Sequence, residues 1–460
     1  MNNKGLVSKL AIAAVLTGLG ALPAQAADLK EALAAAYKSN PTLLAQREAV
    51  KATDETVARA RSRFLPTVSA RFAESKSKSN ITSNTINPDT GQIVSFEEVD
   101  RKSYSLTARQ NVFEGFRGYF GEKVARANVK AGRAQLLTVE QRVLLDGVTA
   151  YMDVLRDQAV MELNQNQVKV LERQLQASQD RFRVGEITRT DVAQSEARLE
   201  GAKSNLRTAE ATLSASRARY TRVMGELPNG LAKPDGLPAL PNNLEAAIDQ
   251  AVENAPNVLA ARYGEKAAAY SVKQSRGALY PTVDVEASIT RSEITLGTLD
   301  RAPETSRVVG VQVNVPLYTG GANYADLRRA KRLRSQRMLQ IREAERVATE
   351  NAFVAWDNLR AATARITSSE AQVRASEIAL EGVRQESAVG SRTTLDVLNQ
   401  EQELLNAKVA LIRAQRDEFV AAYNLLSATG RLTAKSLGLN VEAYDPEKHY
   451  KKASRKIIGG

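Results

Sequence analysis

The 460-residue chain is predicted to be a mainly α-helical protein with a membrane β-barrel section, built from duplicated helix–strand–strand–helix halves. Three observations predict this architecture. The chain repeats itself, each copy contains a very long proline-free stretch, and each copy contains segments in which apolar and polar residues alternate. Aromatic residues make up only 5% of the chain, so we expect extended helices with narrow apolar seams rather than thick globular cores.

The N-terminus has the three parts of a secretory signal peptide. Lys4 and Lys9 form a basic start, residues 10–22 are apolar, and Ala24-Gln25-Ala26 is a small-x-small cleavage site. The apolar run is too short to span a membrane as a helix, and no later run reaches about 18 residues. We therefore expect residues 1–26 to be removed, and because the chain has no cysteine we expect neither disulfides nor a cysteine-linked lipid.

An internal duplication organises the rest of the chain. Residues 29–70 match residues 244–285 at a constant spacing of 215 positions, for example Pro41 with Pro256. Later matches, such as Val184-Gly185 with Val389-Gly390, are 205 positions apart, so the first copy has about ten extra residues within 71–115. We expect two repeats, 27–227 and 244–432, joined by a proline-rich linker at 228–243 and followed by a basic tail at 433–460.

Each repeat is expected to begin with a helix. Asn40 is a helix cap and Pro41 suits the first helical position, so the first helix should run to about Arg63, and the second copy should do the same after Pro256. Two strands follow in each copy. In the second copy, Val283 to Thr290 and Val309 to Val315 alternate apolar and polar residues. In the first copy the alternation is weaker, and the polar stretch 74–102 is expected to be a long exposed loop.

Long helices complete each repeat. Residues 119–182 lack proline and would form about 95 Å of helix. A turn at Val184-Gly185 leads to a returning helix near Asp191, which carries a heptad seam with large residues alternating with Ala or Ser. The second copy repeats this seam from Val397. The seam positions of the first copy are Val192, Ser195, Leu199, Ala202, Leu206, Ala209, Leu213, Ser216, Tyr220 and Val223.

The strands indicate a shared barrel. Strands can cross a bilayer only as a closed barrel, because an open sheet edge leaves backbone groups unpaired in lipid. One chain supplies four strands, whereas the smallest such barrels have about eight, so several copies must contribute; three would give about twelve strands and room for a lumen. The polar face of the second copy, with Asp284, Glu286, Gln312 and Asn314, would line that lumen.

These features together resemble the TolC-like outer-membrane efflux and type I secretion family. The resemblance lies in Phe-Leu-Pro-Thr-Val at 64–68, Leu-Tyr-Pro-Thr-Val at 279–283, Val-Pro-Leu-Tyr-Thr-Gly-Gly at 315–321, and the Val-Gly-x-x-Thr-x-x-Asp-Val turns at 184–192 and 389–397. It covers nearly all of the mature chain. It implies a trimeric 12-stranded outer-membrane β-barrel continuous with a long periplasmic α-helical barrel.

The same resemblance implies a function and its partners. The chain would be the exit duct of a tripartite export system in the outer membrane of a Gram-negative bacterium, surrounded by outer-membrane lipid. It would dock to a periplasmic adaptor and to an inner-membrane pump, either an ABC transporter or a proton-driven one. The cargo is not indicated, because a shared conduit need not recognise what the pump selects.

The family closes its periplasmic end with polar links after the Val-Gly turns. By resemblance, Thr190 and Asp191 would accept hydrogen bonds from Arg392, and Asp396 would form a carboxylate ring. Two positions depart from the family pattern. Ser387 stands where a tyrosine link can occur, and Asn399 stands where a second aspartate ring can occur.

Ordinary helix chemistry is the alternative at these positions. Thr190 and Asp191 also suit a helix cap, and Arg392 with Asp396 also suits an i,i+4 ion pair in a first helical turn.

Composition argues against other functions. The net charge of +12, or 12 − 2 = +10 without the two signal-peptide lysines, is spread among acidic residues except in the tail, so nucleic-acid binding is not expected. His449 is the only histidine and is expected to be solvated; with no cysteine, neither a Ser-His-Asp nor a Cys-His site is possible in the core. No Asp or Glu is expected in an isolated apolar setting, and neither an enzyme nor a cofactor is predicted.

Two rival hypotheses remain from the sequence alone. A periplasmic coiled-coil structural or adaptor protein would account for the heptads and the export signal, but not for strand pairs in both halves. A carboxylate-based periplasmic glycosidase would be a globular monomer rather than an elongated oligomer.

Overall fold

The computed structural model describes residues 28–454 and 456, so the expected signal peptide and the start of the mature chain lie outside the described residues. The helices are α1 (Leu29–Ser39), α2 (Pro41–Arg61), a 3₁₀ turn η1 (Ser62–Phe64), α3 (Arg117–Arg183), α4 (Arg189–Met224), α5 (Leu244–Asn254), α6 (Pro256–Gly277), α7 (Ala322–Ala388), α8 (Thr394–Ala428) and α9 (Pro446–Ala453). The strands are β1 (Thr67–Ile86), β2 (Ile93–Glu114), β3 (Thr282–Leu296), β4 (Leu299–Asp300) and β5 (Glu304–Asn314).

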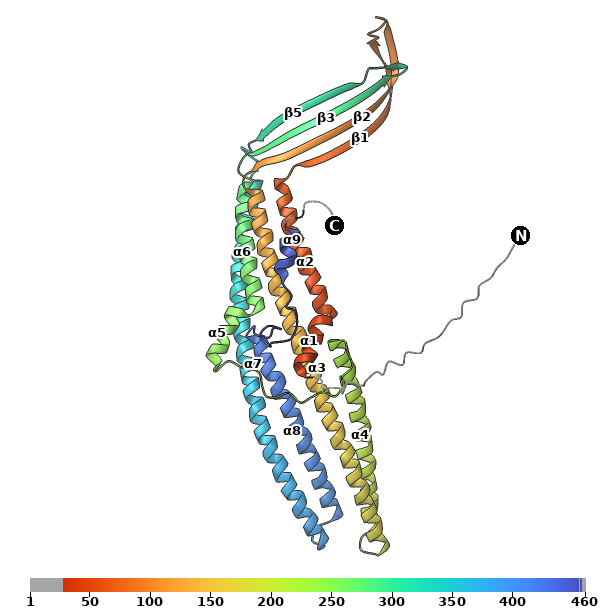
Figure 1. The fold of residues 1–460 in the computed structure, drawn as a ribbon, viewed down its shortest axis with the longest axis vertical. Coiled ribbons are helices and arrows are strands. Elements are labelled where there is room, and N and C mark those ends of the chain that lie inside the picture. The colour runs from red at the N-terminus through yellow and green to blue at the C-terminus, as the bar shows by residue number, and fades with distance from the viewer. Residues whose placement is uncertain (1–27, 455, 457–460) are drawn as a thin grey trace, which may run out of the picture.

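The molecule is elongated, with the sheet at one end and two helical hairpins at the other (Figure 1). Helices α3 and α7 each contain 67 residues, about 100 Å of continuous helix, and pass from the sheet to the distal turns. Helices α4 and α8 return alongside them. The predicted order of helix, two strands and a helical hairpin occurs in both halves. No helix that the structure describes is both long and apolar enough to cross a membrane.

Local sequence signals set the helix ends. The Asn40 side chain accepts a hydrogen bond from the Thr42 amide and Pro41 occupies the first helical position, as predicted. At the distal turns, Thr188 with Asp191 and Thr393 with Asp396 form complete capping boxes. In each box the threonine side chain accepts from the aspartate amide while the aspartate accepts from the threonine amide, so two orphan donors are satisfied.

The predicted heptad seam is the packed face of α4. Eight of its ten positions, all except Val192 and Leu206, are buried, and those two are half-buried. Small residues such as Ala202 and Ala209 let the backbone of α3 approach closely. The ladder of large and small residues therefore holds the first hairpin together without a thick core. In α8 only the seam positions Val397, Ala407 and Ala414 are buried, whereas Gln400, Leu404 and Leu411 are half-buried.

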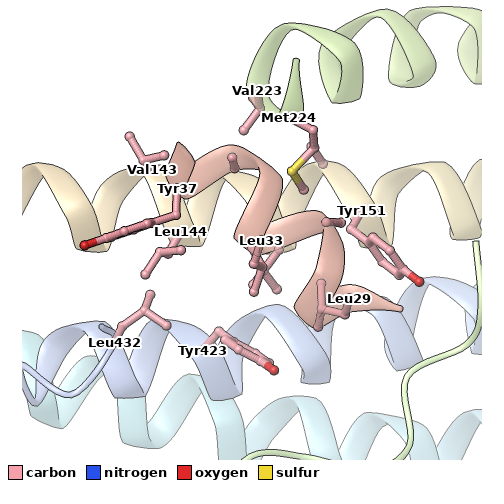
Figure 2. Close-up of a cluster of buried hydrophobic side chains, with 14 of the residues drawn as sticks. Leu29, Leu33, Tyr37, Val143, Leu144, Tyr151, Val223, Met224, Tyr423 and Leu432 are labelled. Carbon is pink, nitrogen blue, oxygen red and sulfur yellow. The ribbon is translucent and has the colours of Figure 1, made fainter. Parts of the chain in front are cut away.

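The main hydrophobic core lies where the hairpins meet the upper helices (Figure 2). Helix α1 inserts Leu29, Leu33 and Tyr37 among α3, α4 and α8, and all three are at least 96% buried. Each fully buried leucine stabilises the fold by about 1.5–3 kcal/mol. The residues that α1 meets include Val143, Leu144 and Tyr151 of α3, Val223 and Met224 of α4, Tyr423 of α8, and Leu432.

The linker and the equivalent aromatic positions take part in this core. Residues 228–243 form neither helix nor strand, and the Tyr151 hydroxyl donates to the Ala232 carbonyl at 2.6 Å. Tyr151 is fully buried, while its counterpart Trp356 is half-buried beside a smaller cluster around Leu425. Both aromatic residues pack, as the sequence indicated, but only Tyr151 joins the main core.

The sheet is antiparallel, in the order β1-β2-β3-β5, with β4 a short addition to β3. The expected loop at 74–102 is wrong: β1 and β2 contain 20 and 22 residues, and only residues 87–92 connect them. The prediction failed because both faces are polar there. Cross-strand ion pairs such as Lys76–Asp100 and Lys78–Glu98 replace the apolar alternation.

The C-terminal segment is folded against the rest of the chain. Leu432, Ala434 and Leu439 belong to the main core, and α9 lies along α2 (Figure 1). The expected solvated histidine is wrong as well, because His449 is only 30% exposed and its Nδ1 lies 3.2 Å from Oδ2 of the fully buried Asp54. The sequence offered no sign that this segment returns to a helix almost 400 positions earlier.

Two of the buried acidic side chains, Asp54 and Glu140, lie against the C-terminal segment. Asp54 contacts His449 and Arg133, and burial raises its pKa. Glu140 is 8% exposed and accepts a hydrogen bond from the Ala434 amide at 2.8 Å. Burial raises the pKa of Glu140 above its ordinary value of 4.5, although the Ala434 amide opposes this. Both carboxylates hold the C-terminal segment rather than an apolar catalytic pocket.

The raised pKa of Glu140 predicts a pH-dependent stability. The folded protein binds a proton at the Glu140 carboxyl more readily than the unfolded chain does. The protonated carboxyl therefore contributes fully to the free energy of unfolding below pH 4.5, and this contribution is lost as pH rises through the raised pKa. Glu140→Gln keeps an acceptor for Ala434 without a charge. We expect the thermal midpoint of this variant to exceed that of the unaltered protein at pH 8, and the difference between the two midpoints to shrink toward pH 4. Thermal unfolding followed by circular dichroism in detergent measures both midpoints, and Glu196→Gln, at an exposed position, is the control. A difference in midpoint that does not change with pH contradicts the account.

Candidate functional site

The sheet has a continuous polar face, as predicted. Register places Asp284 opposite both Gln312 of β5 and Asn111 of β2, while Glu286 lies opposite Arg109. Opposed residues in a sheet point to the same side, so these side chains share one face. The predicted lumen residues Asp284, Glu286, Gln312 and Asn314 all belong to it.

Asp284 is the centre of a small polar cluster on that face. Its Oδ1 accepts from Asn111 Nδ2 at 3.1 Å and lies 3.5 Å from Arg109 Nη2. Arg109 and Asn111 were absent from the predicted site, although the alternation of Leu106 and Ala108 with Thr107 and Arg109 places both on the polar face. The carboxylates of this face are therefore partly balanced by a cation from the neighbouring strand.

The opposite face is apolar and exposed. Val68, Val309, Val311 and Val313 point to it, and Val311 is 67% exposed. Register aligns Val68 and Val309 with Ala108 and Ala287 between them. Burying such a surface releases about 25 cal/mol per Å² of apolar area, so water is an unfavourable neighbour for this face.

Aromatic residues border this apolar face at both ends. At the far end, the rings of Phe72 and Tyr104 pack at a tilt of 43° with their centres 5.1 Å apart, and ion pairs begin two residues further out with Glu74–Lys102. At the helix end, exposed aromatic side chains gather around the strand–helix junctions: Phe64, Phe116, Tyr119, Tyr280 and Tyr318. Between Val283 and Arg291 the strand is about 26 Å long, close to the ~25 Å apolar band of membrane barrels.

The distal turns form the second candidate site. Gly185 and Gly390 have φ values of 83° and 80°, which favour glycine. The preceding residues, Val184 and Val389, are 72% and 81% exposed. Both hairpins thus end in an exposed valine side chain followed by a glycine, as the duplication predicts.

Within the chain, the predicted gate residues make local contacts. Asp191 and Asp396 cap α4 and α8, and hydrogen bonds from Thr188 and Thr393 lower the pKa of each carboxyl. Arg392 Nε donates to Glu386 Oε2 at 2.8 Å rather than to Thr190 or Asp191. The capping alternative therefore describes Asp191 in this chain, and Glu386 is a partner that the sequence did not indicate.

The two departures from the family pattern also have places in the structure. The Ser387 carbonyl accepts from the Gly390 amide at 3.2 Å, so Ser387 supports the turn through its backbone. Asn399 Oδ1 accepts from Arg198 Nη2 at 2.6 Å, which joins α8 to α4. Arg198 was not predicted, although it lies one heptad after Asp191 and therefore on the same face of α4.

Comparison with known proteins supports the same assignment. A family model for outer membrane efflux proteins matches residues 32–226 and 247–431. The outer membrane efflux protein BepC of Brucella suis biovar 1 is 36% identical over 454 residues, which cover 98% of this chain and 96% of BepC. The outer membrane protein TolC of Escherichia coli K12 is 25% identical over 92% of this chain and 86% of TolC.

A solved structure has the same fold. The Campylobacter jejuni CmeC outer membrane channel superposes with a TM-score of 0.75 at 15% identity, over 93% of this chain and 89% of that chain. Both matched segments of the family model coincide with the two repeats found in the sequence. The chain therefore belongs to the outer membrane efflux protein family and is an outer-membrane protein of the Gram-negative type.

Proposed function

We propose that three copies of the chain close a twelve-stranded barrel and form the exit duct of a tripartite export system. The observation that carries this proposal is the open sheet: β1 and β5 each pair on one side only, and their apolar side chains are exposed. An unpaired strand edge is not tolerated in lipid. Each edge strand must therefore pair with an edge strand of another copy of the chain.

Strand direction supports closure by identical copies. Each neighbour in the order β1-β2-β3-β5 is antiparallel, so the two edge strands run in opposite directions. An edge β5 placed beside the β1 of another copy continues the antiparallel pattern. Rotation about a single axis then closes the ring, and three copies supply a strand number within the range of membrane barrels.

The helices would continue the lumen below the barrel. Helices α2, α3, α6 and α7 descend from the sheet, and neighbouring pairs α2–α3, α3–α6 and α6–α7 are in contact. Three such walls would form a tunnel of helices. The rival hypothesis of a periplasmic coiled-coil protein leaves the exposed apolar face of the sheet without a role, and membership of a transport family also argues against a glycosidase.

The distal turns suit both docking and gating. Exposed Val184 and Val389 would contact a periplasmic adaptor, which would link the duct to an inner-membrane pump. Arg392, now paired with Glu386, would exchange this partner for Thr190 or Asp191 of an adjacent hairpin in the closed trimer. Asp396, half-buried at the start of α8, would contribute to a carboxylate ring in the lumen.

The barrel proposal predicts different effects at neighbouring positions of β5. Val311→Lys places a charge on the apolar face, which costs about 2–4 kcal/mol near the membrane midplane, whereas Gln312→Lys places it on the polar face. We expect Val311→Lys to reduce the amount of folded protein in the outer membrane and Gln312→Lys to leave it near normal. Quantifying detergent-extracted protein from outer-membrane fractions checks this, and equal losses for both variants would count against the proposed faces.

The gate proposal predicts a more open channel when Arg392 is removed. Arg392→Ala deletes the donor for any link to Thr190 or Asp191, so single-channel conductance in planar bilayers should rise several-fold. Arg374→Ala, an exposed arginine on the same hairpin, is the matched control and should conduct like the unaltered protein. If Arg392→Ala also conducts like the unaltered protein, Arg392 has no role in closure.

A further inference from the structure

A strongly basic groove lies between α3 and α6, on the side of the wall where α9 is packed. It encloses a cavity of about 240 Å³, and five of its ten lining residues are cations. Only one of its lining residues is a carboxylate. The charged residues of this basic groove are Lys123, Arg126, Lys130, Arg133, Lys266 and Glu447.

The positive charge of the basic groove is only partly compensated. Arg126 pairs with Glu122, and Arg133 pairs with Glu447 and lies 3.8 Å from Asp54. Among the described residues, no carboxylate oxygen lies within ion-pair distance of the remaining three cations, which are all lysines. The lysines are Lys123, Lys130 and Lys266.

Aromatic rings hold two of these lysines in place. Lys123 Nζ lies 5.3 Å from the ring centre of Tyr119, and Lys130 Nζ lies 5.8 Å from that of Tyr263. Lys273, on the same helix as Lys266, lies similarly over Phe120 at 5.6 Å. A ring face orients an ammonium group without neutralising it, so the lysines stay available for an anion.

The basic groove begins just below the apolar face of the sheet. Lys123 is six residues into α3, about 9 Å below the start of that helix. Tyr119 and Phe120 lie between it and the strands, where membrane proteins place aromatic residues at the level of lipid headgroups. The upper end of the groove therefore faces the periplasmic surface of the membrane.

The basic C-terminal segment adjoins the same region. Arg61, near the upper end of α2, donates to the Ser454 carbonyl at 2.7 Å, so the end of α9 approaches the sheet. Tyr450 of α9 lines the basic groove, and Lys448, Lys451 and Lys452 are exposed on α9. The otherwise unexplained positive charge of the tail is thus brought toward the membrane.

We propose that the basic groove binds the phosphate headgroup of an anionic phospholipid from the periplasmic leaflet. Basic pockets at a membrane surface bind phosphate headgroups, and each lysine or arginine near an anionic surface strengthens binding about fivefold. The bound lipid would connect α3, α6 and α9 just below the barrel. This inference rests on the placement of the chain in the outer membrane and goes beyond its role as a duct.

The test measures lipid binding to the purified full-length protein in a non-ionic detergent. Native mass spectrometry would compare short-chain phosphatidylglycerol, short-chain phosphatidylcholine and inorganic phosphate. The test variant combines Lys123→Gln, Lys130→Gln and Lys266→Gln. The control variant removes three charges from the distal hairpin through Lys169→Gln, Arg173→Gln and Lys203→Gln.

We expect the unaltered protein and the control to bind phosphatidylglycerol at least tenfold more tightly than phosphatidylcholine, and the test variant to lose this preference. Equal binding of both lipids by the unaltered protein, or an unchanged preference in the test variant, would overturn the proposal. If inorganic phosphate displaced phosphatidylglycerol when both are present at equal concentration, the basic groove would be a site for free phosphate rather than for a lipid headgroup. Conductance in phosphatidylcholine bilayers should be unchanged in the test variant, which separates this proposal from the function of the duct.

Discussion

In lipid, an unpaired strand edge has no water with which to satisfy its amides and carbonyls, and this constraint governs the whole molecule. The four long strands of the sheet leave two such edges, on β1 and β5. The apolar face beside them is unfavourable in water, and the polar face opposite is unfavourable in lipid. A barrel shared among copies satisfies the edges and both faces together.

The helical part answers a different requirement, which is length without a large core. Helices α3 and α7 extend about 100 Å, and the seam of large and small residues on α4 packs the first hairpin without a thick core. Globular packing is confined to the junction where α1, the linker and the C-terminal segment meet the hairpins. That junction fixes the two repeats to each other, while near the distal turns polar contacts such as the capping boxes and the Arg198–Asn399 hydrogen bond take the place of a core.

Features that depend on short-range chemistry were predictable from the sequence, and features that depend on distant partners were not. The Asn40-Pro41 cap, the α4 seam and the alternation around Asp284 and Gln312 appear as expected, because each follows from residues close in sequence. The outer parts of β1 and β2 were missed because ion pairs conceal their alternation. The contact of His449 with Asp54, and that of Arg198 with Asn399, join residues about 200 or more positions apart, which periodicity cannot reveal.

The central claim is that copies of the chain join edge to edge, and cysteine cross-linking tests it most directly. The chain has no cysteine, so every disulfide cross-link must come from the engineered cysteine pair. Val68→Cys on β1 would be combined in turn with cysteine at Val309, Val311 and Val313 on β5, and oxidised in outer membranes. The account predicts covalent dimers and trimers, and nothing larger, for the pair in register. Monomers alone for every pair, or products beyond three chains, would contradict it.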